Sequence, residues 1–130
     1  MRGVRVLVVE DDAEIRELVE LTLQDEGYDV YTASNGAAAL ELLASTAIEP
    51  SLILLDLQMP VLDGWKFASL YRARTTAPAP IVVLTAALKG AEGARQVGAS
   101  EFLGKPFGLS ELLETVGRFC RSGEVGQSAA

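Results

Sequence analysis

Two apolar segments that end in acidic residues constrain the fold of this chain more than any other feature. Residues 6–9 read Val-Leu-Val-Val and are followed by three acids, and residues 52–55 read Leu-Ile-Leu-Leu and are followed by one. Segments this apolar are typical of parallel strands that are buried on both faces. Ligands bind at the carboxyl ends of such strands, so we predict that Glu10, Asp11 and Asp56 share one pocket.

A pocket with three carboxylates needs positive charge. Carboxylates that share a site repel one another, and a hard divalent cation with oxygen ligands offsets the repulsion. We therefore expect Mg2+ at this pocket, and Lys105 after a later strand would complete a phosphate site. Asp11 or Asp12 also has the position of an N-cap for the next helix, and we expect no further role for Asp12.

Length and composition indicate one soluble domain. A chain of 130 residues can bury a single core without disulfides or metals as staples. No apolar run approaches the roughly 18 to 20 residues of a membrane-spanning helix, and acids interrupt the signal-like start, so we expect a cytoplasmic protein with no membrane contact. The net charge of −7 argues against direct nucleic-acid binding. The single cysteine, Cys120, has the position of a core residue.

Apolar periodicity and turn residues predict five repeats of a strand and a helix. The expected strands are residues 5–10, 29–33, 52–56, 81–85 and 101–104, and the clearest helices are 13–26, 36–45, 64–74 and one that Ser110 would cap. This alternation indicates an α/β protein with a doubly wound parallel sheet. The domain is expected to span residues 1–121, and the small, polar residues 122–130 to be a disordered tail or a truncated linker.

Separate landmarks follow the predicted strands in a fixed order. The acids at Glu10 follow the first strand, Asp56 is followed by Met59-Pro60 and Asp63-Gly64, Thr85-Ala86 follows the fourth strand, and Lys105-Pro106-Phe107 follows the fifth. With these motifs, residues 5–121 resemble the receiver domain of bacterial two-component response regulators. The resemblance implies a flavodoxin-like (βα)5 fold with strand order 2-1-3-4-5, in which the first and third strands are neighbours.

The resemblance also implies how the acids would act. Asp56 would be the phosphoacceptor, whose carboxylate attacks a phosphoryl group to form an aspartyl phosphate. Asp11 and Asp56 would bind Mg2+ directly, with Glu10 one water away and the backbone carbonyl of Gln58 as a further ligand. The metal would allow the anionic nucleophile to approach an anionic phosphate.

Other residues would bind the phosphate and respond to it. Lys105 would neutralise one phosphate oxygen, and the Thr85 hydroxyl and the Ala86 backbone N–H would donate hydrogen bonds to another. In the family the bond before Pro106 is expected to be cis, which turns the lysine toward the pocket. Phe102 resembles the aromatic residue that receivers rotate inward when Thr85 moves toward the phosphate, although it also fits an ordinary core position.

Two glycines weaken the fourth predicted helix. The segment between Thr85 and Lys105 contains Gly90 and Gly93 and is about two residues shorter than is usual in the family. Each glycine costs about 1 kcal/mol in a helix interior. We therefore expect the fourth helix to be short or mobile.

The implied function is that of a signalling switch. A receiver takes its phosphoryl group from a sensor histidine kinase or a histidine phosphotransfer protein. Phosphate on Asp56 would change the surface made by the fourth helix, fifth strand and fifth helix, which would act on a downstream protein or on an output domain that is missing here. We expect no enzyme activity beyond self-catalysed phosphorylation and dephosphorylation of Asp56.

Three alternatives share part of this pattern. A flavodoxin-like FMN carrier has a phosphate loop rich in Ser, Thr and Gly after the first strand. This chain has an acidic loop there, which would repel the FMN phosphate. A haloacid-dehalogenase-like phosphatase has an Asp-x-Asp motif there, whereas this chain reads Glu-Asp-Asp-Ala and has no room for a substrate cap. A degenerate receiver that only docks a partner is the third, and the joint presence of four residues argues against it: Asp11, Asp56, Thr85 and Lys105.

Overall fold

The computed structural model describes the backbone of residues 3–129, and the side chains of these residues except 87–89 and 121–129. Strands and helices alternate along this part of the chain, as predicted. The strands are β1 (Arg5–Val9), β2 (Asp29–Ala33), β3 (Leu52–Asp56), β4 (Ile81–Ala86) and β5 (Glu101–Lys105). The helices are α1 (Ala13–Asp25), α2 (Gly36–Thr46), α3 (Gly64–Ala73), α4 (Ala87–Val97) and α5 (Leu109–Ala129).

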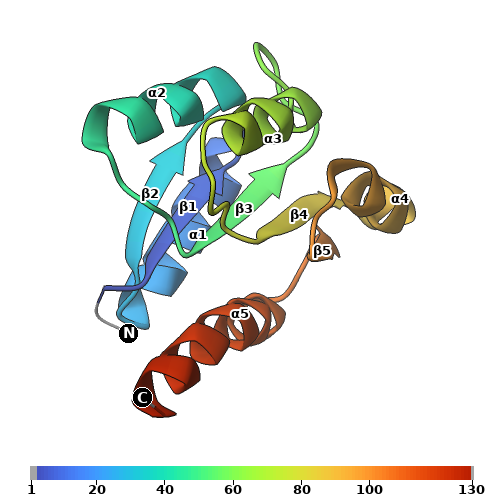
Figure 1. Ribbon diagram of the computed structural model, residues 1–130. Helices are drawn as coiled ribbons and strands as arrows, with labels where there is room; N and C mark the ends of the chain where they lie inside the picture. The colour runs from blue at the N-terminus through green and yellow to red at the C-terminus, as the bar shows by residue number, and fades with distance from the viewer. Residues whose placement is uncertain (1–2, 130) are drawn as a thin grey trace.

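The strands form one parallel sheet in the order β2-β1-β3-β4-β5, which confirms the predicted topology (Figure 1). Strand register decides which residues meet at its carboxyl edge. Val9 pairs with Leu55, so Glu10, which follows β1, and Asp56, the last residue of β3, stand at the same level. Asp56 pairs in turn with Leu84 of β4. The register therefore brings the ends of β1, β3 and β4 side by side.

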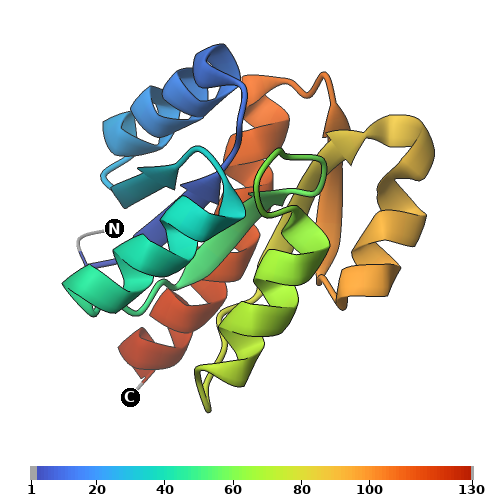
Figure 2. The ribbon, with the colours of Figure 1, turned by 90° about the horizontal axis from the view of Figure 1, so that it is seen from above.

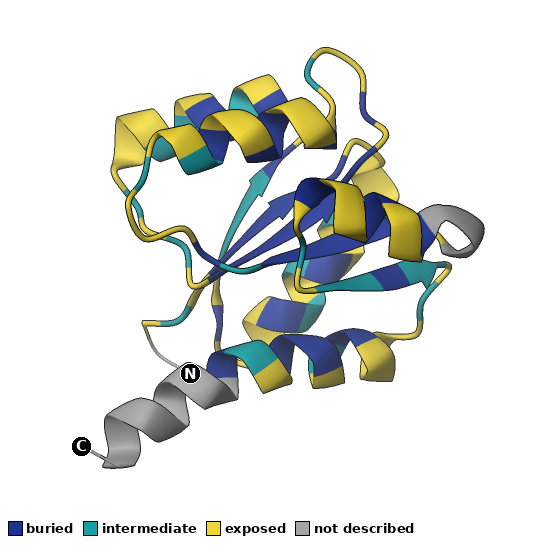
Figure 3. Cartoon of the chain, turned by 45° about the vertical axis from the view of Figure 1, so that its right-hand side comes forward, coloured by how far each residue is buried: buried dark blue, intermediate teal, exposed yellow. Residues whose placement is uncertain are grey.

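Helices cover both faces of the sheet. Alternate strand residues point to opposite faces, because successive side chains of a strand do so. Leu7 and Val9 belong to the core under α2, α3 and α4, whereas Val6 and Val8 belong to the core under α1 and α5 (Figure 2). The three central strands, β1, β3 and β4, are mostly buried, the edge strands β2 and β5 are mostly intermediate, and the outer faces of the helices are exposed (Figure 3). Cys120 is buried in the second core, as predicted.

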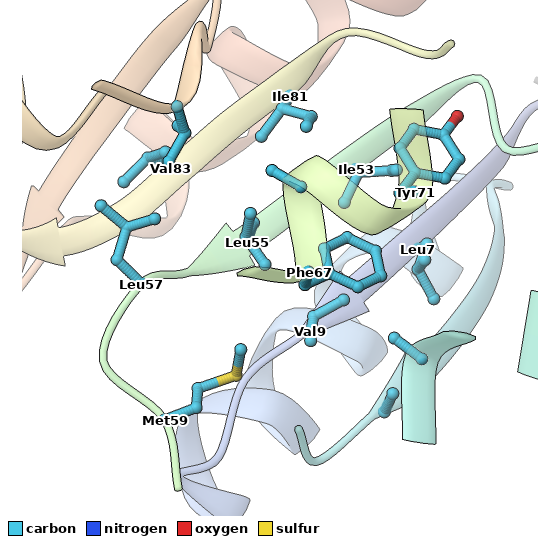
Figure 4. Packing of buried hydrophobic residues seen from close by; sticks show 14 of the residues in the cluster. Leu7, Val9, Ile53, Leu55, Leu57, Met59, Phe67, Tyr71, Ile81 and Val83 are labelled. Carbon is cyan, nitrogen blue, oxygen red and sulfur yellow. The ribbon is translucent and has the colours of Figure 1, made fainter. Parts of the chain in front are cut away.

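The core beneath α3 fixes the end of β3. Phe67 and Tyr71 stack with their ring centroids 5.9 Å apart, and they lie over Leu55 and its neighbours (Figure 4). The Tyr71 hydroxyl accepts a hydrogen bond of 2.8 Å from the backbone N–H of Ala79, so its polar atom is satisfied in the buried position. Packing of this kind holds the strand that carries Asp56 in one position.

Helix α4 differs from the prediction. It has 11 residues, so the expectation of a short fourth helix is wrong, while its mobility stays a prediction. The reason lies in the two glycines, which are buried against the sheet. A Cβ at Gly93 would lie 2.6 Å from Leu57, and a Cβ at Gly90 would overlap the ring of Phe102. Close packing of the helix offsets the conformational cost of its glycines.

The last helix also begins differently. Its first residue is Leu109, and the backbone N–H of Leu112 donates to the Gly108 carbonyl at 3.0 Å, so Gly108 has the N-cap position and Ser110 lies in the first turn. The prediction of Ser110 as the cap is wrong, because glycine is itself accepted there. Helix α5 extends past residue 121. The side chains from residue 121 onward lie outside the described residues, so the disordered tail or truncated linker at 122–130 stays a prediction.

Within the described residues, no helix is both long enough and apolar enough to cross a membrane.

The loop after β3 contains a strained residue. Val61 has a φ of 71°, in the left-handed region, and 80% of its surface is exposed. This conformation costs an L-residue roughly 1–2 kcal/mol, and the clash is most severe for a β-branched side chain. Hydrogen bonds hold the loop here: the Leu62 N–H donates to Pro60 at 2.9 Å, and the Leu62 carbonyl accepts from Gly36 at 3.1 Å.

We predict that Val61→Asn raises the free energy of unfolding by about 1 kcal/mol, because asparagine tolerates the left-handed region and no packing is lost. Urea denaturation would measure the change. Val61→Thr is the matched control, since threonine is also β-branched and should leave stability unchanged. Equal stability of the two variants would contradict the assignment of strain to Val61.

Candidate functional site

Three carboxylates meet at the carboxyl edge of the sheet, as the sequence predicted. Glu10 and Asp11 follow β1, Asp56 is the last residue of β3, and an oxygen from each lies within 4.8 Å of the others. Glu10 is fully buried, Asp56 is 4% exposed, and Asp11 is open to solvent. The site therefore has a buried acidic floor and one exposed acid at its mouth.

Lys105 supplies positive charge to this floor. Its Nζ lies 2.7 Å from Glu10 Oε1 and 3.4 Å from Asp56 Oδ2. The lysine ends β5, where its backbone is paired with Ala86 of β4, and its bond to Pro106 is cis. The strand end and the following turn bring the ammonium over the end of β3. One cation thus contacts two of the three acids.

The acids and the lysine line a cavity of about 390 Å³ that opens at this edge. It contains every residue predicted for the metal and the phosphate, whereas Phe102 and Pro106 lie outside it. The lining residues are Glu10, Asp11, Asp12, Ile15, Asp56, Gln58, Thr85, Ala86 and Lys105.

Asp12 has the capping role that was expected of it. Its Oδ1 accepts hydrogen bonds from the backbone N–H groups of Glu14 at 2.9 Å and Ile15 at 3.1 Å, at the start of α1. Its own N–H donates to Glu10 Oε2 at 3.1 Å. The turn thereby orients the Glu10 carboxylate, and the side chain of Asp12 is occupied by the helix. Asp11 is the acid of this turn that groups with Glu10 and Asp56.

Arg16 is a further residue of the site, and no prediction was made for it from the sequence. Its Nη1 donates to the backbone carbonyls of Glu10 at 2.9 Å and Asp11 at 3.4 Å, so a guanidinium holds the acidic turn from the side of α1. The signal in the sequence is a cation within the first turns of a helix, where acidic side chains are favoured and cations are not. An arginine placed there against the helix dipole indicates a partner in the preceding loop.

The other predicted residues lie on β4 and β5 or shortly after β3. Thr85 is 4% exposed and borders the cavity beside Ala86. The backbone N–H of Gln58 donates to Asp56 Oδ1 at 3.1 Å, which orients that carboxylate. The role of the Gln58 carbonyl as a metal ligand stays a prediction. Phe102 is partly buried on β5 and packs against the core under α4.

The charges of the site perturb one another. Burial, a hydrogen bond with Asp11 and the charge of Glu10 raise the pKa of Asp56 to about 7, and the charge of Lys105 only partly opposes them. Burial acts to raise the pKa of Asp11, but hydrogen bonds with Asp56 and Glu10 bring it below the usual range. Burial acts to lower the pKa of Lys105, but Glu10 and Asp56 raise it above its ordinary value. One cation leaves the acids under-compensated.

These residues fit a hard divalent cation. Glu10 Oε1 is buried and, despite its contact with Lys105, accepts no hydrogen bond of normal geometry within the described part of the chain. Two further carboxylates offer oxygens beside it. Oxygen donors of this kind are the ligands that Mg2+ prefers, and an added positive charge would favour the ionised form of Asp56.

Comparison with known proteins agrees with this geometry. The family model for the response regulator receiver domain matches residues 6–117. The transcriptional regulatory protein SphR for alkaline phosphatase synthesis in Synechococcus elongatus is 41% identical over 84% of this chain and 46% of its own length. The response regulator MprA of Mycolicibacterium vanbaalenii is 39% identical over 98% of this chain and 56% of its own length.

Solved structures show the same fold. The chemotaxis protein CheY4 of Vibrio cholerae has a TM-score of 0.79 and 35% identity, and the match covers 89% of this chain and 98% of that one. The receiver domain of the Francisella response regulator 1452 has a TM-score of 0.80 and 27% identity, with 93% and 99% covered.

The chain belongs to the family of response regulator receiver domains, and its fold is flavodoxin-like. Phosphorylation and Mg2+ binding are general features of this family. The chain spans about half the length of the curated relatives that it matches.

We predict that Asp56 makes the metal-free protein less stable as pH rises. Its pKa is about 7 in the folded chain against an ordinary 3.8, so between these values the unfolded chain releases a proton that the folded chain keeps. The penalty is absent near pH 4, grows through this window and is complete above pH 7. Asp56→Asn should therefore be the more stable protein at pH 8, by on the order of 2–4 kcal/mol.

Urea denaturation at about pH 4 and about pH 8 in chelator would measure this difference, because these values lie near the lower end of the predicted window and above it. The same experiment with Mg2+ is the control. Mg2+ should shrink the difference at the higher pH, because a bound cation favours the ionised carboxylate. A stability difference that does not change with pH would contradict the raised pKa of Asp56.

We predict that Gly64→Ala damages the end of β3. A Cβ at Gly64 would lie 2.6 Å from the Asp56 carbonyl oxygen and 2.7 Å from Leu57 Cα, which are backbone atoms that cannot turn away. The free energy of unfolding should fall by roughly 1–3 kcal/mol in urea denaturation. Gly108→Ala is the matched control, because a Cβ there would meet nothing within 4 Å, and its cost should be limited to the about 0.5–1 kcal/mol by which alanine is the poorer N-cap. Equal losses at the two glycines would contradict the prediction.

Proposed function

We propose that the chain is a phosphoacceptor switch in which Asp56 takes a phosphoryl group from a sensor histidine kinase or a histidine phosphotransfer protein. The observation that carries the proposal is the placement of Asp56 Oδ2 3.4 Å from Lys105 Nζ in a cavity shared with two further acids. An aspartate with a perturbed pKa, an adjacent cation and a fitting metal site is suited to nucleophilic attack on phosphate.

The step exchanges one bond to phosphorus for another. A carboxylate oxygen of Asp56 forms a bond to phosphorus, the bond from phosphorus to the donor imidazole nitrogen breaks, and the imidazole leaves with the electron pair of that bond. Lys105 would neutralise a phosphate oxygen, and the Thr85 hydroxyl and Ala86 N–H would donate hydrogen bonds to another. Positioning and neutralisation of charge account for most of the catalysis.

The residues that would hold Mg2+ are Asp11 and Asp56, with Glu10 through a water and the backbone carbonyl of Gln58. When bound, the ion would offset the negative charge that opposes attack by one anion on another. Arg16 contributes by holding the backbone of the acidic turn, and the Gln58 N–H by orienting Asp56.

The output of the switch would be the surface of α4, β5 and α5. A phosphate on Asp56 would draw Thr85 toward it and favour another position of Phe102, so that two states of this surface differ in population. Arg118 of α5 and Glu101 of β5 form an ion pair on this surface. A downstream protein or an output domain would recognise it.

We further propose that the chain acts in the cytoplasm, where ATP-dependent histidine kinases phosphorylate their partners. Its only catalysis would be the formation and hydrolysis of its own aspartyl phosphate, so it is not an enzyme with a separate substrate. The family membership supports the histidine kinase as the partner.

Intact mass after incubation with acetyl phosphate tests the proposal. The wild type should gain one phosphoryl group with Mg2+ and none in chelator, and Asp56→Asn should gain none. Asp63→Asn is the matched control, because it makes the same change at the N-cap of α3, where asparagine caps equally well. Lys105→Ala should slow uptake by roughly 100-fold.

No uptake by a wild type whose fold is intact would favour a degenerate receiver that serves as a docking module. Equal uptake by the wild type and Asp56→Asn would move the phosphoacceptor to another residue.

A further inference from the structure

Small residues of helix α4 lie against the layer beneath it. Among the described side chains of this helix, the buried positions are Gly90, Gly93, Ala94 and Val97, whose spacing places them on one face. A Cβ at Gly93 would lie 2.6 Å from Leu57 Cδ1. A Cβ at Gly90 would lie 3.0 Å from Phe102 Cγ and would overlap the adjacent ring atoms. The backbone of α4 therefore rests directly on two side chains of the layer beneath.

These two side chains are close along the chain to residues of the proposed phosphate site. Leu57 directly follows Asp56 in the chain, and Phe102 lies on β5, three residues before Lys105. Phe102 is paired in register with Val83, two residues before Thr85 on β4. A change at the carboxyl edge of the sheet would reach α4 through these contacts.

The other end of α4 is tied to α3. The Arg72 guanidinium donates to the carbonyls of Val97 and, at 3.0 Å, Gly98, which close the carboxyl end of α4. The Trp65 indole N–H donates to Gln96 Oε1 at 3.0 Å. With these contacts fixed, a displacement of the Phe102 ring would tilt the amino-terminal half of α4.

We propose that Gly90 is a positioning residue of the switch. Because it has no side chain, the Phe102 ring can lie beneath α4, and the helix takes its position from the ring. The role of this contact in signalling rests on the proposed phosphorylation of Asp56, whereas the contact itself does not. A methyl group at Gly90 would exclude the present ring position and uncouple α4 from the phosphate site.

The contact between Gly90 and Phe102 is tested by whether the effect of Gly90→Ala on stability changes sign when the Phe102 ring is removed. Glycine to alanine in a helix interior normally stabilises, because alanine has less conformational freedom to lose on folding. Gly90→Ala should instead lower the urea midpoint while Phe102 is present, and should raise it or leave it unchanged in a Phe102→Ala background. Gly108→Ala, at an open position, should shift the midpoint equally in both backgrounds.

The same comparison stays decisive if Gly90→Ala does not fold. Folding should then return in the Gly90→Ala, Phe102→Ala double variant, in which the ring is gone. The proposal would be overturned if Gly90→Ala shifted the midpoint equally in both backgrounds. It would also be overturned if the double variant failed to fold while Phe102→Ala alone folded.

Emission from Trp65, the single tryptophan of the chain, tests the coupling to phosphate, since its indole contacts α4. With acetyl phosphate and Mg2+, the wild type and Gly108→Ala should change their emission. A folded Gly90→Ala protein should take up the phosphoryl group by mass within twofold of the wild-type level but lose at least half of the emission change.

The outcomes separate the two proposals. A wild type that gains no phosphoryl group defeats the proposed function and with it the signalling role of Gly90, while the urea midpoints still decide the packing contact. A wild type that gains the group but shows no emission change, or a Gly90→Ala protein with the full change, overturns the coupling and leaves the phosphoacceptor function standing.

Discussion

Repulsion among three carboxylates at one edge of the sheet is the constraint on which the rest of this structure depends. Glu10 and Asp56 are buried almost completely, and one ammonium, from Lys105, contacts both. Burial of charge is costly unless it is compensated, and a single cation leaves the pKa of Asp56 near 7. The same imbalance that costs stability makes the site attractive to a divalent cation and to the chemistry of phosphate.

The fold supplies the geometry for this arrangement. Neighbouring positions of β1 and β3 in the sheet bring two acidic strand ends together, and packing of Phe67 and Tyr71 under α3 holds one of them in place. On the other side of the site, α4 lies on Leu57 and Phe102 with no side chain between them at its two glycines. The chemical site and the surface proposed for signalling are therefore in direct contact.

Sequence reasoning succeeded where the chemistry is local. An apolar strand that ends in an acid, an N-cap at Asp12 and the alternation of strands and helices all depend on residues that are close along the chain, and the structure has them as predicted. It failed at α4, since glycine propensity describes an isolated helix and says nothing of a sheet beneath it. The role of Arg16 was missed and Ser110 was wrongly predicted as a cap, because both depend on which backbone groups the folded loops leave unpaired.

The sequence by itself determined the fold class, the order of the strands once the family motifs were read, and the set of residues that gather at the carboxyl edge, because periodicity and strand-end chemistry are written along the chain. Only the tertiary structure decided that Lys105 contacts Glu10 more closely than Asp56, and that Gly90 lies against Phe102. Distances between residues far apart in sequence follow from packing, which acts on the whole molecule at once.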